Sequence, residues 1–482
     1  MKWETVIGLE VHAELSTKTK IFCGCPTAFN ASPNTHVCPG CAGMPGTLPA
    51  LNRSVVEYAM RLGLTLNCNI DKHCEFDRKH YFYPDLPGSY QISQFYHPIC
   101  RDGFLEINVQ GNKKEIRIKQ IHMEADAGKL LHGPQGTLMD FNRASMPLLE
   151  IVSQPDLRSA TEVIAYLDKL REILLYLEVS DCKMEEGSMR ADINLSVRRE
   201  GEELGVRVEM KNINSFKAIE RAIEYEALRQ IETLEDGGQL FQETRRWDDE
   251  KGQSFGMRSK ENAQDYLYFP DPDLLPLEID DAWFSRVRDN LPELAHQKRE
   301  RYIKDYGISE DEALVLTIHK NISALFEGIA AECKNSNAAV NGASAAIEAA
   351  HLLSGEVLRL MNNTNTLPED LSLDVKKLAS LIGFVLDGKI NRSAYKKTVE
   401  AVFTNNVDPE KYIIDNGLLM IRDDKAVIEA VEKVLEEEKE AAADYRAGKE
   451  KIFGFLMGQV MKKLGGKGNP EAAKKILLER LK

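Results

Sequence analysis

Long hydrophobic runs are missing from this sequence of 482 residues. No apolar stretch approaches the roughly 20 residues that a helix needs to cross a bilayer. Residues 1–7 enter a strand-like pattern at once, without the basic segment and cleavage site of a signal peptide. We therefore expect a cytoplasmic protein that does not associate with membranes.

Basic residues are also fewer than acidic residues in this sequence. Lys and Arg number 62 against 76 Asp and Glu, which gives a formal net charge of -14. This balance argues against a nucleic-acid-binding surface that covers the whole protein, because a phosphate backbone attracts Lys and Arg. The same acidity could simply keep the chain soluble. Any contact with a nucleic acid must therefore depend on a local basic patch.

Familiar nucleotide and nucleophile motifs are absent as well. The sequence has no G-x-x-x-x-G-K-[ST] loop and no G-x-G-x-x-G after a strand. The glycine-rich segment 463–469 follows a helical pattern and lacks the phosphate-loop spacing. There is no G-x-S-x-G and no catalytic-cysteine signature. A bound nucleotide would have to be held by metal ions and by side chains on a sheet.

Hydrophobic periodicity divides the chain near residue 290. Before that point apolar residues alternate with period 2, as in segments 6–15, 116–123, 191–197 and 206–210, and helical patterns intervene. Beyond it only helical patterns follow, with a second, softer boundary at residues 405–409. We predict an α+β fold with an antiparallel sheet in an N-terminal domain at 1–290, an all-α helical domain at 291–406, and a helical tail domain at 407–482.

The tail contains the local basic patch that the net charge conceals. Few acids stand among its cations, which suits the phosphate backbone of a folded RNA. A helix pair with a lysine-rich exposed side is a serious competing interpretation. The cations are Arg446, Lys449, Lys451, Lys462, Lys463, Lys467, Lys474, Lys475, Arg480 and Lys482.

Four of the nine cysteines lie close together near the N-terminus. They form a C-x-C pair followed by a C-x-x-C pair: Cys23, Cys25, Cys38 and Cys41. Two short chelate loops of this kind can supply four thiolates to a tetrahedral Zn²⁺. Because all four positions would be filled, we predict a structural zinc site; the alternative is four reduced thiols in a loop.

Four predicted strands carry unusual chemistry on their polar faces. Successive side chains of a strand point to opposite faces, so alternate residues share a face. If these strands are neighbours, the carboxylates and His could bind Mg²⁺ while Arg and Lys bind phosphate; the alternative is a set of ordinary solvent-facing surfaces. The polar faces hold Glu10, His12 and Glu14; His122, Glu124 and Asp126; Arg190, Asp192, Asn194 and Ser196; and Arg207, Glu209 and Lys211.

Several segments in order along the chain resemble one family. They include Gly8-Leu9-Glu10-Val11-His12 and Gly458-Gln459-Val460-Met461-Lys462, together with residues 76–85, 122–129, 156–159, 189–196, 209–216, 257–273 and 453–470. These segments resemble the B subunit of the bacterial, glutamine-dependent Asp/Glu-tRNA amidotransferase. The resemblance implies a cradle-like catalytic domain, a helical domain and a tail that binds tRNA.

The resemblance also implies a reaction and partners. The family is a carbon–nitrogen ligase that uses ATP to phosphorylate the side-chain carboxylate of misacylated Glu-tRNA(Gln) or Asp-tRNA(Asn). Ammonia then displaces the phosphate to give the amide. It arrives through a channel from an amidase-type glutaminase subunit, and a small third subunit completes the heterotrimer.

Carried onto this chain, the family's catalytic and magnesium-binding positions match Glu10, His12 and Glu124. Lys79 lies where the ammonia channel should open and is expected to take part in catalysis. Further metal or ATP contacts are expected at Asp192, Glu209, Arg190, Arg207 and Lys211. The zinc-binding form of the family matches Cys23, Cys25, Cys38 and Cys41.

Two positions depart from the family pattern. Ala125 replaces the second acid of H-x-E-E-D-x-G-K, and Leu267 replaces the Arg of D-Y-R-Y-F-P. Strand parity places Ala125 on the face away from Glu124, so the metal ligands could be spared. The loss of an Arg could weaken contact with phosphate or tRNA. The alternative function is therefore that of a catalytically decayed paralogue that serves as a tRNA-binding scaffold.

Overall fold

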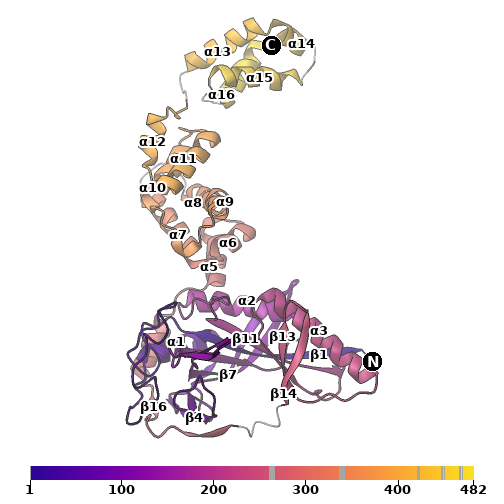
Figure 1. The fold of residues 1–482 in the computed structure, drawn as a ribbon. Helices are drawn as coiled ribbons and strands as arrows, with labels where there is room; N and C mark the ends of the chain where they lie inside the picture. The colour runs from indigo at the N-terminus through magenta and orange to yellow at the C-terminus, as the bar shows by residue number, and fades with distance from the viewer. Residues whose placement is uncertain are drawn as a thin grey trace. The chain divides into compact units, whose positions relative to one another are not determined.

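The computed structural model describes residues 2–259, 266–335, 342–420, 424–446, 449, 451–465, 468 and 470–481 (Figure 1). The chain divides into two compact units, Met1–Leu294 and Ala295–Lys482. The first unit contains the described strands and the second contains helices. The predicted α+β class, with the sheet first and the helices after it, is confirmed.

A nine-stranded sheet forms the centre of the first unit, in the order β14-β13-β12-β11-β1-β10-β7-β6-β2. Its described pairings are antiparallel except for β12 with β13, which is parallel. The exception follows from the connection, because a helix crosses over between these two strands. The strands are β1 (Trp3–Glu14), β2 (Asn69–Ile70), β6 (Cys100–Val109), β7 (Asn112–Ala125), β10 (Pro147–Ser153), β11 (Met189–Arg199), β12 (Val208–Lys211), β13 (Glu243–Asp248) and β14 (Gln253–Ser259).

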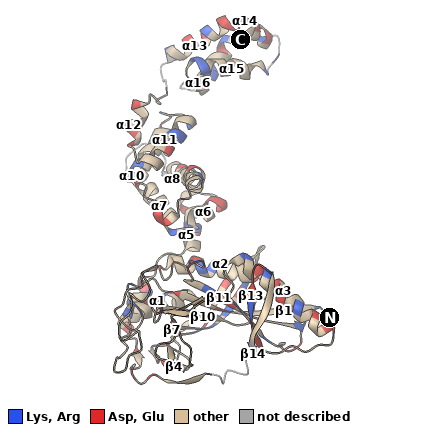
Figure 2. Cartoon of the chain, in the orientation of Figure 1, with Lys and Arg blue, Asp and Glu red and all other residues tan. Residues whose placement is uncertain are grey.

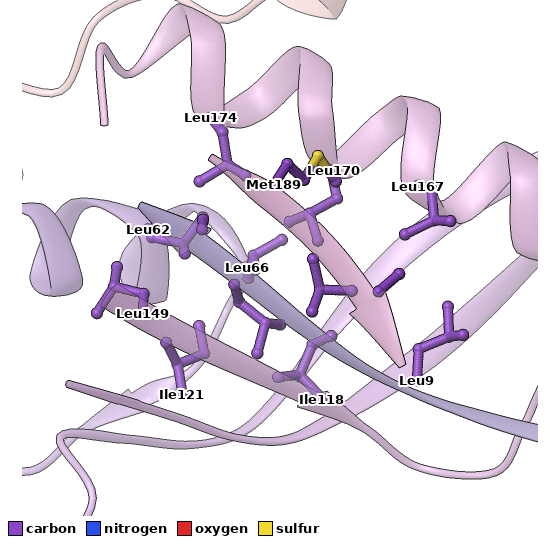
Figure 3. Packing of buried hydrophobic residues seen from close by; sticks show 14 of the residues in the cluster. Leu9, Leu62, Leu66, Ile118, Ile121, Leu149, Leu167, Leu170, Leu174 and Met189 are labelled. Atoms are coloured by element: carbon purple, nitrogen blue, oxygen red, sulfur yellow. The ribbon is translucent and has the colours of Figure 1, made fainter. Parts of the chain in front are cut away.

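Three helices cover the apolar face of this sheet (Figure 1). They are α1 (Arg53–Thr65), α2 (Ala160–Tyr176) and α3 (Phe216–Glu235). Each begins at a polar residue whose side chain accepts a hydrogen bond from a backbone N–H of the first turn: Asn52, Ser159 and Ser215. Figure 3 shows how Leu62 of α1, Leu66 directly after α1, and Leu170 and Leu174 of α2 pack with Leu149 and Ile121 of the sheet.

Strand alternation separates this core from the polar face. Leu9, Val11 and Ala13 of β1 are fully buried, whereas Glu10 and His12 point to the other side. On that polar side lies a small three-stranded sheet in the order β15-β4-β5 (Figure 1). Its strands are β4 (Asp77–His80), β5 (Tyr90–Ser93) and β15 (Leu267–Pro270). The polar face is therefore partly covered, unlike an ordinary solvent-facing sheet.

The remaining elements of the first unit are short. The pair β3 (His73–Cys74) and β16 (Leu277–Glu278) and the hairpin β8 (Lys129–Gly133) and β9 (Gly136–Asp140) form separate two-stranded sheets, and α4 (Asp281–Asp289) follows.

The second unit contains two buried hydrophobic clusters, one within residues 302–413 and one within residues 427–481. Among the described residues, none of its helices, nor any in the first unit, combines the length and apolarity that crossing a membrane requires. Its α-helices are α5 (Ala295–Arg301), α6 (Glu310–Thr317), α7 (Lys320–Asn335), α8 (Gly342–His351), α9 (Leu358–Thr364), α10 (Val375–Leu386), α11 (Arg392–Asn405), α12 (Pro409–Asp415), α13 (Asp424–Glu437), α14 (Lys439–Arg446), α15 (Ile452–Lys463) and α16 (Pro470–Leu481).

Candidate active site

Two imidazoles and two carboxylates meet on the polar face of the large sheet. The register places His12 opposite Glu150, and Glu150 opposite His122. Glu150 Oε2 lies 3.4 Å from His12 Nε2 and 3.2 Å from His122 Nε2, while Glu124 Oε1 lies 3.6 Å from His12 Nε2. Ligand atoms of His12, Glu124 and Glu150 all lie within 4.8 Å of one another, so these three residues, the His12 group, could hold one metal ion.

Burial and ion pairing set the protonation of the two imidazoles, His12 and His122. Burial lowers the pKa of His122, but the Glu150 and Glu124 carboxylates outweigh it and raise that pKa to about 10. Burial likewise opposes the charged form of His12, and Glu150 and Glu124 again raise its pKa overall. Because a metal ion binds neutral imidazole, metal binding at His12 would compete with protonation.

Three further carboxylates form a second group, the Glu10 group, made of Glu10, Asp192 and Glu209. Their ligand atoms also lie within 4.8 Å of one another. Glu10 lies opposite Asp192 in the register of β1 and β11, and Glu209 stands on β12, the next strand. Burial first, and then the charges of Glu150 and Glu209, raise the pKa of Glu10. Glu10 is therefore influenced by both groups, and a divalent cation would relieve the repulsion between these acids.

Neutral side chains orient two of these carboxylates. Asn194 Nδ2 donates a hydrogen bond to Glu10 Oε1 at 2.9 Å. Thr244 Oγ1 donates to Glu209 Oε2 at 2.9 Å, and both of these residues are buried. Such bonds fix the position of a ligand before a metal arrives and commonly affect metal affinity.

The predicted set of Glu10, His12 and Glu124 is thus divided between two neighbouring groups. The sequence patterns did not identify Glu150 as a candidate ligand. Glu150 completes the group of His12 and Glu124. Its signal in the sequence is a single acid inside the mostly apolar run of β10. Such a run is typical of a buried strand, in which an unpaired charge is costly.

Three predicted phosphate-binding cations occupy different environments. Lys211 Nζ lies 2.6 Å from Asp192 Oδ2 and 3.0 Å from Glu209 Oε1, so it already balances part of the Glu10 group. Arg190 Nη2 donates to the Asp126 carboxylate at 3.3 Å, and its buried Nε has no acceptor in the described part of the chain. Arg207 precedes β12 and is exposed, outside the sheet.

Lys79 of β4 faces the His12 group from the small sheet. Burial opposes its charge, but the carboxylates of Glu124 and Glu150 and the Tyr268 hydroxyl outweigh this effect and raise its pKa above the usual range. Its Nζ also lies 4.9 Å from the centre of the Tyr266 ring. The structure therefore brings Lys79 into the electrostatic field of the predicted metal ligands.

The four N-terminal cysteines converge as their spacing predicts. Cys41 Sγ lies 3.9 Å from both Cys25 Sγ and Cys38 Sγ, and the set includes Cys23. Zn–S bonds of 2.3 Å in a tetrahedron place sulfur atoms about 3.8 Å apart, so the cluster has the size of a zinc site. The pKa of Cys41 is lowered to about 4: the hydrogen bond with Cys23 contributes most, burial opposes the change, and the Cys38 N–H and the charge of Lys20 add to the lowering.

Comparison with known proteins places the chain in a family. Residues 5–285, more than half of the chain, match the model of the GatB/GatE catalytic domain. The chain belongs to the GatB/GatE family. Residues 334–481 match a second family model, the GatB domain.

Full-length relatives support the same placement and confirm the resemblance seen in the sequence. The B subunit of the aspartyl/glutamyl-tRNA(Asn/Gln) amidotransferase of Lachnoclostridium phytofermentans is 54% identical over 99% of both chains. The protein of the same name from Caldicellulosiruptor bescii is 51% identical over 100% of this chain and 99% of its own length. That of Thermoanaerobacter sp. strain X514 is 50% identical over 100% of both.

The two departures from the GatB/GatE pattern lie outside both carboxylate groups. Ala125 lines a cleft together with Arg78, Tyr90 and Cys41, and Glu124 is not among the cleft residues. Strand parity thus places Ala125 away from the metal ligands. Leu267, on β15, pairs with His80 and is 67% exposed.

The basic residues of the tail are distributed over its last helices. Lys462 and Lys463 end α15, and Lys474, Lys475 and Arg480 lie on α16. Acids accompany them: Lys463 Nζ lies 2.7 Å from Glu437 Oε1, and Arg480 Nη2 lies 2.8 Å from Glu432 Oε1. Figure 2 shows both signs of charge on α13 to α16. Lys467 and Lys482 lie outside the described residues.

Proposed function

We propose that this chain is the component of a tRNA-dependent amidotransferase that activates misacylated Glu-tRNA(Gln), Asp-tRNA(Asn) or both. The observation that carries the proposal is the convergence of the His12 group, the Glu10 group and Lys79 on one partly covered face of the sheet. The names of the full-length relatives supply the substrate class.

The proposed chemistry explains why a site of this kind is needed. A side-chain carboxylate is a poor electrophile, and transfer of the γ-phosphoryl group of ATP to it creates an acyl phosphate with a good leaving group. Attack by ammonia then forms the C–N bond and releases phosphate. Mg²⁺ bound by the two groups would offset charge on the triphosphate.

Residues of this chain would prepare the site for each step. The His12 and Glu10 groups would hold Mg²⁺ through imidazole nitrogen and carboxylate oxygen. The Arg190 side chain is partly exposed and could donate to an anion, and Lys211 stands next to the Glu10 group. Lys79, a cation beside the His12 group, is positioned to stabilise charge on the incoming phosphoryl group or on the tetrahedral centre formed with ammonia.

The absence of a nucleophile motif for glutamine hydrolysis implies a partner chain. We propose that ammonia comes from a separate glutaminase subunit, that a small third subunit completes the heterotrimer, and that the basic helices α15 and α16 contact the tRNA backbone. The cysteine cluster, which could bind a metal such as zinc, would be structural because its four thiolates would fill a tetrahedral site.

The decisive experiment is reconstitution of the purified three-subunit complex with ATP and glutamine. Glu-tRNA(Gln) and Asp-tRNA(Asn) are supplied separately, and amide formation is followed on the aminoacyl group. ATP-dependent Gln-tRNA or Asn-tRNA is the expected product. If neither forms while the complex still binds tRNA, the enzyme proposal fails and the alternative of a decayed scaffold takes its place.

A further inference from the structure

Lys20 is a fully buried lysine beside the four cysteines. Its exposed fraction is 0%, and its backbone N–H donates to the Cys25 carbonyl at 2.9 Å, so it belongs to the same loop as the first cysteine pair. Its ammonium donates to Cys41 Sγ at 3.5 Å and to the Phe141 carbonyl at 3.2 Å. Within the part of the chain that the structure describes, it forms no ion pair with a carboxylate.

A buried ammonium ion is costly unless a negative charge lies nearby. The Phe141 carbonyl is neutral, so the remaining partner that can carry charge is the sulfur of Cys41. Four neutral thiols would leave the lysine uncompensated. Four thiolates around Zn²⁺ would instead carry a net charge of −2, and one ammonium ion would balance half of it.

We propose that Lys20 is a positioning residue of the zinc site: its ammonium bonds the Cys41 thiolate, offsets the charge of the tetrathiolate centre and slows the loss of zinc. This inference rests on the proposed structural zinc. Cys41 would then receive two donors, because the Cys38 N–H also points to its sulfur at 3.2 Å. Donors of this kind orient a ligand and reduce its charge density.

Lys20 would also connect the metal site to the segment that follows β9. Phe141 N–H donates to Asn34 Oδ1 at 2.8 Å, and Asn142 Nδ2 donates to the Ser32 carbonyl at 2.8 Å. Arg143, directly after these residues, donates from Nε to Asp126 Oδ2 at 2.5 Å. The zinc loop is thus bonded at several points to a segment that contacts the end of β7.

The test compares two identical substitutions in the same loop, made in the full-length chain within its complex. Lys20→Met keeps an apolar stem of similar length but removes the charge. Lys18→Met is the matched control, because Lys18 is exposed. Zinc content is measured by elemental analysis, and zinc loss is followed with a chromogenic chelator. We expect Lys20→Met to bind zinc about 10- to 100-fold more weakly, and Lys18→Met to behave as the parent chain does.

A second variant separates charge from folding. Lys20→Arg keeps the positive charge and should retain zinc far better than Lys20→Met. The increase in Tm on zinc loading, relative to the chelated protein, should shrink in Lys20→Met, even if both forms are less stable than the parent. Equal zinc loss from the parent and from Lys20→Met would overturn the role of Lys20 but leave the zinc site standing. A parent chain that contains no zinc would refute the site itself and the inference with it.

Discussion

Replacing Glu150 with Gln tests the composition of the His12 group most directly. Glu150 lies between two imidazoles, 3.4 Å from His12 and 3.2 Å from His122. Glutamine preserves the shape of the side chain and removes one negative charge. At an effective dielectric constant of about 20, a pair of unit charges 3.2 Å apart interacts by about 5 kcal/mol. We therefore expect the pKa of His122, raised to about 10 in the parent protein, to fall by several units.

The same substitution should weaken metal binding and abolish most activity. Substitution of a residue that only hydrogen-bonds a metal ligand typically lowers metal affinity or activity by about 10- to 100-fold. Glu150 is proposed as a ligand itself, so the loss should reach at least about 100-fold. The fold should survive, because His122 can lose its proton when its partner charge disappears.

The assay combines three measurements on the three-subunit complex: Mn²⁺ binding by electron paramagnetic resonance, amide formation, and histidine titration by NMR. Glu106→Gln is the matched control, because Glu106 is exposed on β6 and forms an ion pair with the exposed Lys113. Wild-type Mn²⁺ affinity together with wild-type amide formation in Glu150→Gln would refute the assignment of Glu150 as a ligand.

Three further predictions concern other parts of the chain. Lys79→Met should reduce amide formation by about 100-fold or more, both from glutamine and from ammonium salts; a loss limited to the glutamine reaction would instead place Lys79 in ammonia delivery. Thr244→Val should weaken Mn²⁺ binding about 10-fold by removing the hydrogen bond that orients Glu209 Oε2, and Thr244→Ser should restore the affinity; equal Mn²⁺ affinity in the two variants would exclude this positioning role for Thr244. Neutralising three cations of α16 to Gln should weaken tRNA binding and lower the slope of log affinity against log salt by about 2 to 3, whereas an unchanged slope would exclude α16 from the tRNA interface. These cations are Lys474, Lys475 and Arg480.

Sequence periodicity predicted which residues share a face, because that property is local. The alternation around Glu10 and His12 is sufficient to separate them from Leu9 and Val11. Strand order is not local: β1 lies between β10 and β11, which are more than 130 residues away in the chain. The pairing of His12 with Glu150 and of Glu10 with Asp192 therefore could not be obtained from periodicity.

Glu150 illustrates a second limit. It lies in a strand whose other residues are mostly apolar, and an isolated acid there has no helical or alternating pattern to mark its role. The parallel pairing of β12 with β13 was also not foreseen. It depends on α3 crossing over the sheet. Packing of the apolar face of that helix determines this crossover, and the strands themselves do not.

The energetic cost of the site bears on the choice between an active enzyme and a decayed scaffold. Five carboxylates converge in the two groups, and burial together with like charge raises the pKa of Glu10. Groups of this kind reduce stability unless a cation fills them, and replacing them with neutral residues is an easy route to a more stable protein. A scaffold that only binds tRNA would have no use for this arrangement. The departures at Ala125 and Leu267 leave it intact, since the Ala125 side chain lines a cleft that does not include Glu124 and Leu267 is exposed on β15. The physical balance therefore favours a chain that still binds metal and carries out the activation step.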